Sequence, residues 1–353
     1  MKSDLLEQTA VSTAEVDDQC ISIPSPFQMR QNLPLDENGQ ATVARARTEI
    51  GDILQGKDSE RLLILCGPCS IDNVNSALVY AERFARLAEE VLDKALLVMR
   101  TYFEKPRSVV GWKGLLYDPM TEGERSPAAG IALARRLLAR LTGSGVSCAT
   151  EFLNPLLAPY LEDCMSYGSI GARTVESQIH RELASRLEMP IGLKNGMDGG
   201  LSSAVNAVRS AQSSHSFYSQ DLHGCPALVS TQGNNGAHVI LRGGSNGPNF
   251  DSKSVSNAVD AGRLLGLSRG VVVDCSHGNS GKDHRKQASV AMEVLRQKVA
   301  GQDGIAGIML ESNLVAGQQS ANAGPRVFGQ SITDACIGWK DTECLVRELA
   351  ASL

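Results

Sequence analysis

The sequence has few aromatic residues and no long apolar segment, and these absences exclude several classes of protein. Phenylalanine, tryptophan and tyrosine make up 4% of the 353 residues, too few for the aromatic platforms on which single-stranded nucleic acids stack. No apolar run approaches the roughly 20 residues that a membrane-spanning helix needs. The net charge of -5 provides no overall attraction for nucleic acid or an anionic membrane. We therefore expect neither as a partner.

Targeting signals and nucleotide-binding loops are also lacking. Residues 1–26 contain no apolar run and carry several acidic side chains, so they match neither a secretory signal nor a basic transit peptide. The nine cysteines are scattered without framework spacing, which is typical of reduced thiols in a cytoplasmic protein. No Walker-type phosphate loop is present, and the glycines of residues 243–247 do not match a dinucleotide fingerprint.

What the sequence does contain is a repeated alternation of short apolar runs and longer segments with helical periodicity. Continuous apolarity is typical of parallel strands that are buried on both faces. Eight such runs predict an α/β fold, a (β/α)8 TIM barrel, with a doubly wound open sheet as the alternative. The runs are residues 62–66, 95–99, 146–149, 169–172, 190–193, 238–241, 271–275 and 305–310.

Two additions to a bare barrel are predicted. Residues 1–60 form an N-terminal arm, irregular to about residue 38 and followed by an amphipathic helix at 41–55, and residues 61–353 form the barrel. An inserted β-hairpin at about 214–233, with strands at 216–219 and 227–231, lies between the fifth and sixth barrel strands. Decoration or an oligomer contact is one interpretation of these additions, and regulation is the other.

A chemically active residue follows each apolar run, where barrel enzymes place their active sites. Cationic residues form one set, and clustering them at one barrel mouth would suit two anionic substrates, or one with several charges. The alternative is that these cations pair with surface acids. In chain order the residues are Cys69, Arg100, Glu151, Arg173, Lys194, Arg242, His277 and Glu311, with Lys105, Arg107 and Asp334 in nearby loops.

The second set is Cys69, His277, Glu311 and Asp334. One thiolate, one imidazole and two carboxylates suit a single borderline divalent ion such as Mn, Fe, Co, Zn or Cu. Cys66 and Cys69 also have the spacing of a thioredoxin-type redox pair. Because Cys66 lies inside its apolar run, we interpret Cys69 as a ligand and Cys66 as a strand residue.

Several motifs give the sequence a resemblance to the type I 3-deoxy-D-arabino-heptulosonate 7-phosphate (DAHP) synthases. The similarity runs from about residue 40 to the C-terminus and is greatest to the feedback-regulated bacterial subfamily. The motifs are Gly67-Pro68-Cys69-Ser70, Arg100-Thr101-Tyr102-Phe103-Glu104-Lys105-Pro106-Arg107, Gly111-Trp112-Lys113-Gly114, Gly171-Ala172-Arg173-Thr174, Lys194-Asn195-Gly196, Leu241-Arg242-Gly243-Gly244, Asp274-Cys275-Ser276-His277-Gly278-Asn279 and Ser331-Ile332-Thr333-Asp334.

The resemblance implies a transferase that condenses phosphoenolpyruvate with D-erythrose 4-phosphate and water to give DAHP and phosphate. This reaction opens the shikimate route to chorismate and the aromatic amino acids. The implied residue roles are metal binding by Cys69, His277, Glu311 and Asp334, phosphoenolpyruvate binding by Arg100, Lys105, Ala172, Arg173, Lys194 and Arg242, sugar-phosphate binding by Lys105, Pro106, Arg107 and Ser108, proton donation by Lys105, and water orientation by Glu151. Position 108 is often threonine in the family, and serine keeps the hydroxyl.

The same resemblance implies that the arm and hairpin form an inhibitor site for an aromatic amino acid. Segments such as Met189-Pro190 and 231–234 are more similar to tyrosine-sensitive members, whereas other stretches resemble tryptophan-sensitive ones. Tyrosine is the predicted inhibitor, with tryptophan as the alternative. A homodimer or homotetramer is expected. Three alternatives remain: a sister synthase that uses arabinose 5-phosphate, a catalytically silent sensor of aromatic amino acids, and a thiol-disulfide protein.

Overall fold

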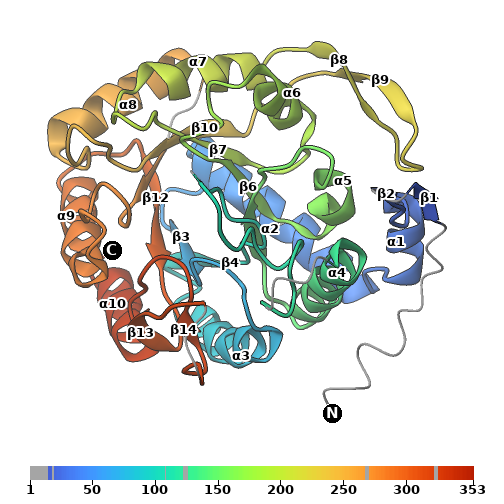
Figure 1. Ribbon diagram of the computed structural model, residues 1–353. Helices are drawn as coiled ribbons and strands as arrows, with labels where there is room; N and C mark the ends of the chain where they lie inside the picture. The colour runs from blue at the N-terminus through green and yellow to red at the C-terminus, as the bar shows by residue number, and fades with distance from the viewer. Residues whose placement is uncertain (1–14, 18–19, 108, 122–125, 267–269, 322–324) are drawn as a thin grey trace.

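Eight parallel strands close into a barrel in the order β3, β4, β5, β6, β7, β10, β11, β12, with β12 beside β3 (Figure 1). The computed structural model describes residues 15–17, 20–107, 109–121, 126–266, 270–321 and 325–353. Every predicted run overlaps a barrel strand, so the TIM barrel is confirmed and the open sheet is wrong. The strands are β3 (Leu62–Gly67), β4 (Ala95–Arg100), β5 (Cys148–Glu151), β6 (Tyr167–Ile170), β7 (Ile191–Lys194), β10 (Ala237–Leu241), β11 (Val271–Asp274) and β12 (Ile305–Glu311).

The strands are apolar throughout because both of their faces are buried. Alternate residues of β3, Leu63 and Leu65, belong to the cluster that fills the barrel, while Leu62 and Ile64 pack in the larger cluster with the surrounding helices. Helix α2 (Glu37–Gln55) adds Ile50, Ile53 and Leu54 to the interior cluster, and Figure 1 shows it crossing behind the barrel. The helix predicted at 41–55 begins earlier because Asp36 caps it, accepting from the backbone N–H of Gly39 at 2.7 Å.

Helices cover the outside of the barrel, as expected for parallel strands joined by crossovers. No described helix combines the length and apolarity of a membrane span. The outer elements are α3 (Val74–Glu90), α4 (Pro127–Gly143), α5 (Ala158–Leu161), η1 (Glu162–Cys164), α6 (Gln178–Arg186), α7 (Ser202–Ala211), α8 (Ser252–Leu264), η2 (His284–Lys286), α9 (Gln287–Val299) and α10 (Trp339–Ala351), with a small sheet of β13 (Val315–Gln318) and β14 (Gln330–Ser331).

The N-terminal arm is more regular than its sequence suggested. Strands β1 (Glu15–Asp17) and β2 (Cys20–Ile21) pair, and α1 (Pro26–Asn32) follows. Ser25 and Gln28 form a capping box, with the Ser25 hydroxyl accepting from the Gln28 N–H at 3.3 Å and the Gln28 amide accepting in return at 3.0 Å. The expectation of an irregular segment to residue 38 was wrong at α1, because this cap begins a short helix despite its weak apolar pattern.

The inserted hairpin lies where it was predicted, between the fifth and sixth barrel strands. Strands β8 (His215–Gln220) and β9 (Pro226–Thr231) pair in antiparallel register, and Figure 1 shows them reaching toward α1. The Phe27 N–H donates to the Leu222 carbonyl at 2.7 Å, and the Phe27 and His223 rings lie 4.6 Å apart. The arm and the hairpin tip are therefore in direct contact.

Candidate functional site

A cavity of about 650 Å³ opens at the ends of the barrel strands. Its lining includes eleven of the residues singled out in the sequence: Lys105, Pro106, Arg107, Glu151, Ala172, Arg173, Lys194, Arg242, His277, Glu311 and Asp334. Cys69 and Arg100 are buried beneath its surface and do not line it. Ser108 lies outside the described residues. Residues from all around the barrel thus meet at one mouth, as the strand-end pattern predicted.

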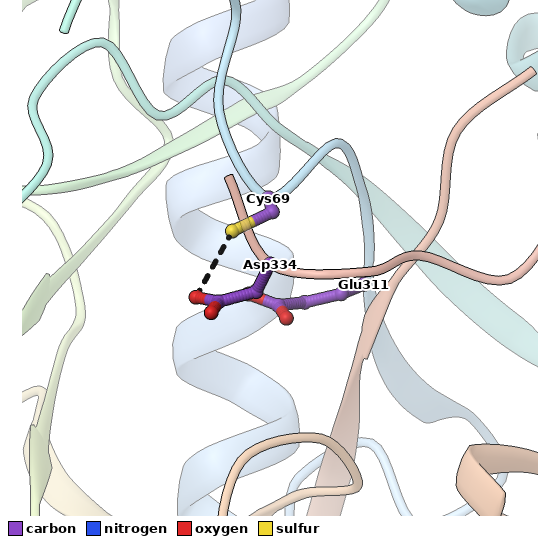
Figure 2. A group of neighbouring side chains, drawn as sticks. All are labelled: Cys69, Glu311 and Asp334. Carbon is purple, nitrogen blue, oxygen red and sulfur yellow. Dashed lines mark hydrogen bonds between the residues drawn. The ribbon is translucent and has the colours of Figure 1, made fainter. Parts of the chain in front are cut away.

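Three of the four predicted metal ligands form a compact cluster. One ligand atom from each of Cys69, Glu311 and Asp334 lies within 4.8 Å of the others, and Figure 2 shows the three side chains converging. The Cys69 Sγ lies 3.5 Å from the Asp334 Oδ2. The fourth, His277, has its Nε2 3.8 Å from the Glu311 Oε1. Sulfur and oxygen donors therefore surround one small space, and the His277 nitrogen lies beside its Glu311 member. A set of this composition suits a borderline divalent ion.

The His277 ring is oriented by its neighbours. The Ser276 hydroxyl donates to the Asp274 Oδ1 at 2.6 Å and lies 2.7 Å from the His277 Nδ1. A hydroxyl that donates to the carboxylate accepts from the imidazole, so the ring proton is assigned to Nδ1. The Nε2 lone pair is then free to bind a metal. Such outer hydrogen bonds are typical of metal-binding histidines, so the residues present fit a divalent ion.

Glu311 is the most firmly held member of the cluster. The Gln287 side chain accepts from the Glu311 N–H at 2.8 Å and donates to the Glu311 carbonyl at 3.0 Å. The Arg100 guanidinium pairs with the Glu311 carboxylate at 3.1 Å and lies 3.9 Å from the Tyr102 ring centroid. Sequence reasoning missed Gln287, because a glutamine at a helix start gives no distinctive signal.

Lys105 lies against the buried thiol of Cys69. Its Nζ is 3.0 Å from the Cys69 Sγ and 3.3 Å from the Cys69 carbonyl oxygen. Burial, together with the negative charge of Glu311, raises the pKa of the Cys69 thiol to about 11. Burial lowers the pKa of Lys105, but the negative groups of Cys69, Glu311 and Asp334 outweigh it and raise that pKa above its ordinary value. Lys105 is therefore a charged ammonium group beside the donor cluster.

The remaining cations around the cavity have few acidic partners. Among the described residues, Arg107, Arg173 and Arg242 form no ion pair, whereas the Lys194 Nζ lies 3.2 Å from the Asp274 Oδ2. Lys282 also lines the cavity and was not singled out in the sequence. Guanidinium groups without carboxylate partners in a cavity are available to bind phosphate or carboxylate. The alternative prediction, that these cations pair with surface acids, is therefore wrong for the residues that the structure describes.

Glu151 shares the mouth with Gly171. A Cβ atom at position 171 would lie 2.2 Å from the Glu151 Oε1, so any larger residue would displace this carboxylate. The end of β5 and the Gly171-Ala172-Arg173-Thr174 motif after β6 are therefore linked by one close contact.

Comparison with known proteins gives consistent results. A model of the DAHP synthetase I family matches residues 32–347. The Tyr-sensitive phospho-2-dehydro-3-deoxyheptonate aldolase of Escherichia coli is 46% identical over 351 residues, covering 99% of this chain and 98% of that enzyme. The Phe-sensitive enzyme of Escherichia coli is 46% identical over 326 residues, covering 92% and 93%. A solved phospho-2-dehydro-3-deoxyheptonate aldolase from Francisella tularensis matches with a TM-score of 0.92 and 40% identity, covering 95% and 98%.

Proposed function

Because the chain belongs to the DAHP synthetase I family, we propose that its cavity condenses phosphoenolpyruvate with D-erythrose 4-phosphate and water, giving DAHP and phosphate. This is the first step of the shikimate pathway to chorismate and the aromatic amino acids. One observation supports the proposal most strongly. The cavity brings a cluster of residues that can hold a metal ion together with cationic residues that form no ion pair among the described residues. Phosphoenolpyruvate carries a phosphate and a carboxylate, and the aldose brings a second phosphate, so the reaction needs several cations.

Cys69, His277, Glu311 and Asp334 would hold one divalent ion, of Mn, Fe, Co or Zn. When bound, the ion supplies Lewis acidity to the aldehyde oxygen, which gains negative charge as the new carbon–carbon bond forms. The protein orders two of these residues beforehand. Ser276 contacts the His277 ring, Arg100 pairs with the Glu311 carboxylate, and Gln287 holds the Glu311 backbone. Such prior ordering avoids reorganisation during the reaction.

The chain's other residues bind the substrates and move protons. Lys105 would protonate the aldehyde oxygen, and Glu151 would orient the water that adds to the former enol carbon. Holding two substrates together also removes much of the entropic barrier. The cavity-lining residues proposed for phosphoenolpyruvate are Lys105, Ala172, Arg173, Lys194 and Arg242, with Arg100 proposed as a buried member of the set beneath them. Those proposed for the sugar phosphate are Lys105, Pro106, Arg107 and Ser108.

Removing the metal should abolish the reaction. We expect the protein to lose activity after a chelator has removed the metal and has itself been removed. Added Mn²⁺ should restore the activity, because it restores the Lewis-acid stabilisation. The measurement is the rate of phosphoenolpyruvate consumption before chelation, after it and after adding Mn²⁺. Full activity in protein that elemental analysis shows to be free of metal would contradict the metal assignment.

Arg107→Ala should weaken binding of the sugar phosphate selectively. Arg107 is exposed at the cavity and forms no ion pair among the described residues, so its guanidinium is available to a phosphate. We expect the KM for erythrose 4-phosphate to rise about tenfold to a hundredfold, with little change for phosphoenolpyruvate. Arg173→Ala is the matched control, with the reverse pattern expected. Equal effects on both substrates would reassign Arg107.

We propose that the arm and hairpin form a site for an aromatic amino acid inhibitor, with tyrosine the expected one, in a homodimer or homotetramer. The contact between Phe27 and the hairpin tip supports this proposal. Phe27→Ala should weaken inhibition about tenfold, since ring contacts and their burial contribute on the order of 1–2 kcal/mol, while leaving the uninhibited kcat unchanged. Inhibition curves with tyrosine, phenylalanine and tryptophan measure this. Insensitivity of the unaltered protein to all three would refute the regulatory proposal.

The alternatives are distinguished by simple assays. Faster turnover with arabinose 5-phosphate than with erythrose 4-phosphate would favour the sister synthase. Binding of an aromatic amino acid without any product would favour a sensor. Thiol titration with and without Mn²⁺ tests the redox interpretation, because Mn²⁺ should lower the reactivity of Cys69 and leave that of the buried Cys66 unchanged.

A further inference from the structure

Asp274 is a fully buried carboxylate that contacts both sets of groups in the cavity. It ends β11 and is 0% exposed. Its Oδ1 accepts from the Ser276 hydroxyl at 2.6 Å and from the Ser276 N–H at 3.0 Å. Its Oδ2 lies 2.9 Å from the His277 Nδ1 and 3.2 Å from the Lys194 Nζ. One side chain thus touches a member of the donor set and a member of the cation set.

The two partners come from different parts of the barrel. Lys194 ends β7, and β10 lies between β7 and β11, so the ion pair spans an intervening strand. Among the described residues, Asp274 is the carboxylate with which Lys194 pairs. Lys194 is itself only 3% exposed, so loss of this partner would leave a nearly buried ammonium group without its counter-charge.

Asp274 also determines which nitrogen of the His277 ring carries the proton. The hydroxyl of Ser276 links the Asp274 Oδ1 to the His277 Nδ1, so the carboxylate fixes the ring proton on Nδ1 and leaves Nε2 facing Glu311. The Asp274 Oδ2 also pairs with the Lys194 ammonium group at 3.2 Å, so the negative charge of this carboxylate lies beneath the cavity, between the two sets of groups.

We propose that Asp274 is a positioning residue that sets both His277 for metal binding and Lys194 for binding the anionic substrate, so that one buried carboxylate assembles the two halves of the site. Asp274 does not line the cavity and acts through its neighbours. The identities of the metal and of the anion rest on the proposed function. The roles of the His277 imidazole and the Lys194 ammonium group rest on their contacts with Asp274 and Ser276.

The test is the variant Asp274→Asn, which keeps the shape and removes the charge. The amide NH₂ of the asparagine would face the His277 Nδ1 and the Lys194 Nζ, which are both donors in the unaltered protein. His277 would then favour the tautomer with its proton on Nε2, and the Lys194 ammonium group would be repelled. We expect the Kd for Mn²⁺ to rise tenfold to a hundredfold, the usual effect of losing an outer partner of a metal-binding histidine. At saturating Mn²⁺, the Kd for phosphoenolpyruvate should rise at least about tenfold. Both are measured by calorimetric titration without turnover.

Asp260→Asn is the matched control, because it removes one carboxylate from an exposed ion pair with Arg263 on α8; neither Kd should change. A variant at position 274 that alters only one of the two affinities, or neither, would overturn the inference. If the unaltered protein binds Mn²⁺ but not phosphoenolpyruvate, the proposed function fails instead.

A second measurement covers the case in which Asp274→Asn does not fold. Nitrogen-15 NMR of the imidazoles in the metal-free, unaltered protein reports the tautomer of His277, assigned by comparison with His277→Gln. A neutral ring with its proton on Nδ1 supports the role of Asp274. A neutral ring with its proton on Nε2 would overturn it.

Discussion

Cys69→Ala is expected to lower kcat by about three orders of magnitude, the scale on which loss of a main electrostatic stabiliser slows an enzyme. Cys69 supplies the sulfur of the donor cluster, and its Sγ lies near both Asp334 and Lys105. Without it, three donors remain and affinity for soft and borderline ions falls. The measurements are the metal content of the purified protein and kcat at saturating Mn²⁺.

Cys66→Ala is the matched control, because it removes a buried thiol three positions away. The Cys66 Sγ contacts the Tyr80 hydroxyl at 3.4 Å, on the helix-facing side of β3, so we expect normal metal content and kcat with a stability loss of about 1 kcal/mol. If both cysteine variants lost activity equally, the redox interpretation would regain support. Full activity of a metal-free Cys69→Ala protein would contradict the metal site.

Lys105→Met is expected to lower kcat by about 10² to 10⁴, the range typical of a lost general acid. The methionine side chain fills similar space but carries no proton. Mn²⁺ affinity should not fall, because the lost ammonium group is a positive charge 3.0 Å from the Cys69 sulfur. The measurement is kcat at saturating Mn²⁺ and substrates, with Mn²⁺ affinity determined separately.

Lys113→Met provides the comparison for Lys105. Lys113 belongs to the same loop but does not line the cavity, and its Nζ lies 6.0 Å from the Tyr117 ring centroid. We expect this variant to keep kcat within about twofold, as is usual for substitutions outside a site. A Lys105→Met protein with unchanged kcat, or one that fails only through lost metal, would show that Lys105 is not the proton donor.

The barrel could be predicted because its signal is local and repeated. Runs such as residues 62–66 and 305–310 are short and apolar at every position, which is typical of strands buried on both faces. The carboxyl ends of all strands in such a barrel lie at one mouth. The sequence could therefore predict that His277 and Glu311 lie close together although they follow different strands.

Other features depend on contacts that no local pattern encodes. Arg100 ends its strand like the other cations, yet it pairs with Glu311 beneath the cavity rather than lining it. The links of Asp274 to Lys194 and of Gln287 to Glu311 join distant segments. The Tyr-sensitive and Phe-sensitive relatives are each 46% identical to the chain, over 351 and 326 residues, so the prediction of tyrosine rests on short segments rather than on overall similarity.

The proposed reaction joins phosphoenolpyruvate to a four-carbon sugar phosphate in this cavity. It is tested by product analysis, using mass spectrometry and a phosphate assay, with Mn²⁺-loaded protein and both substrates. We expect DAHP and inorganic phosphate in equal amounts, with neither formed when erythrose 4-phosphate is omitted. Phosphate release without DAHP, or no turnover by the fully loaded protein, would contradict it.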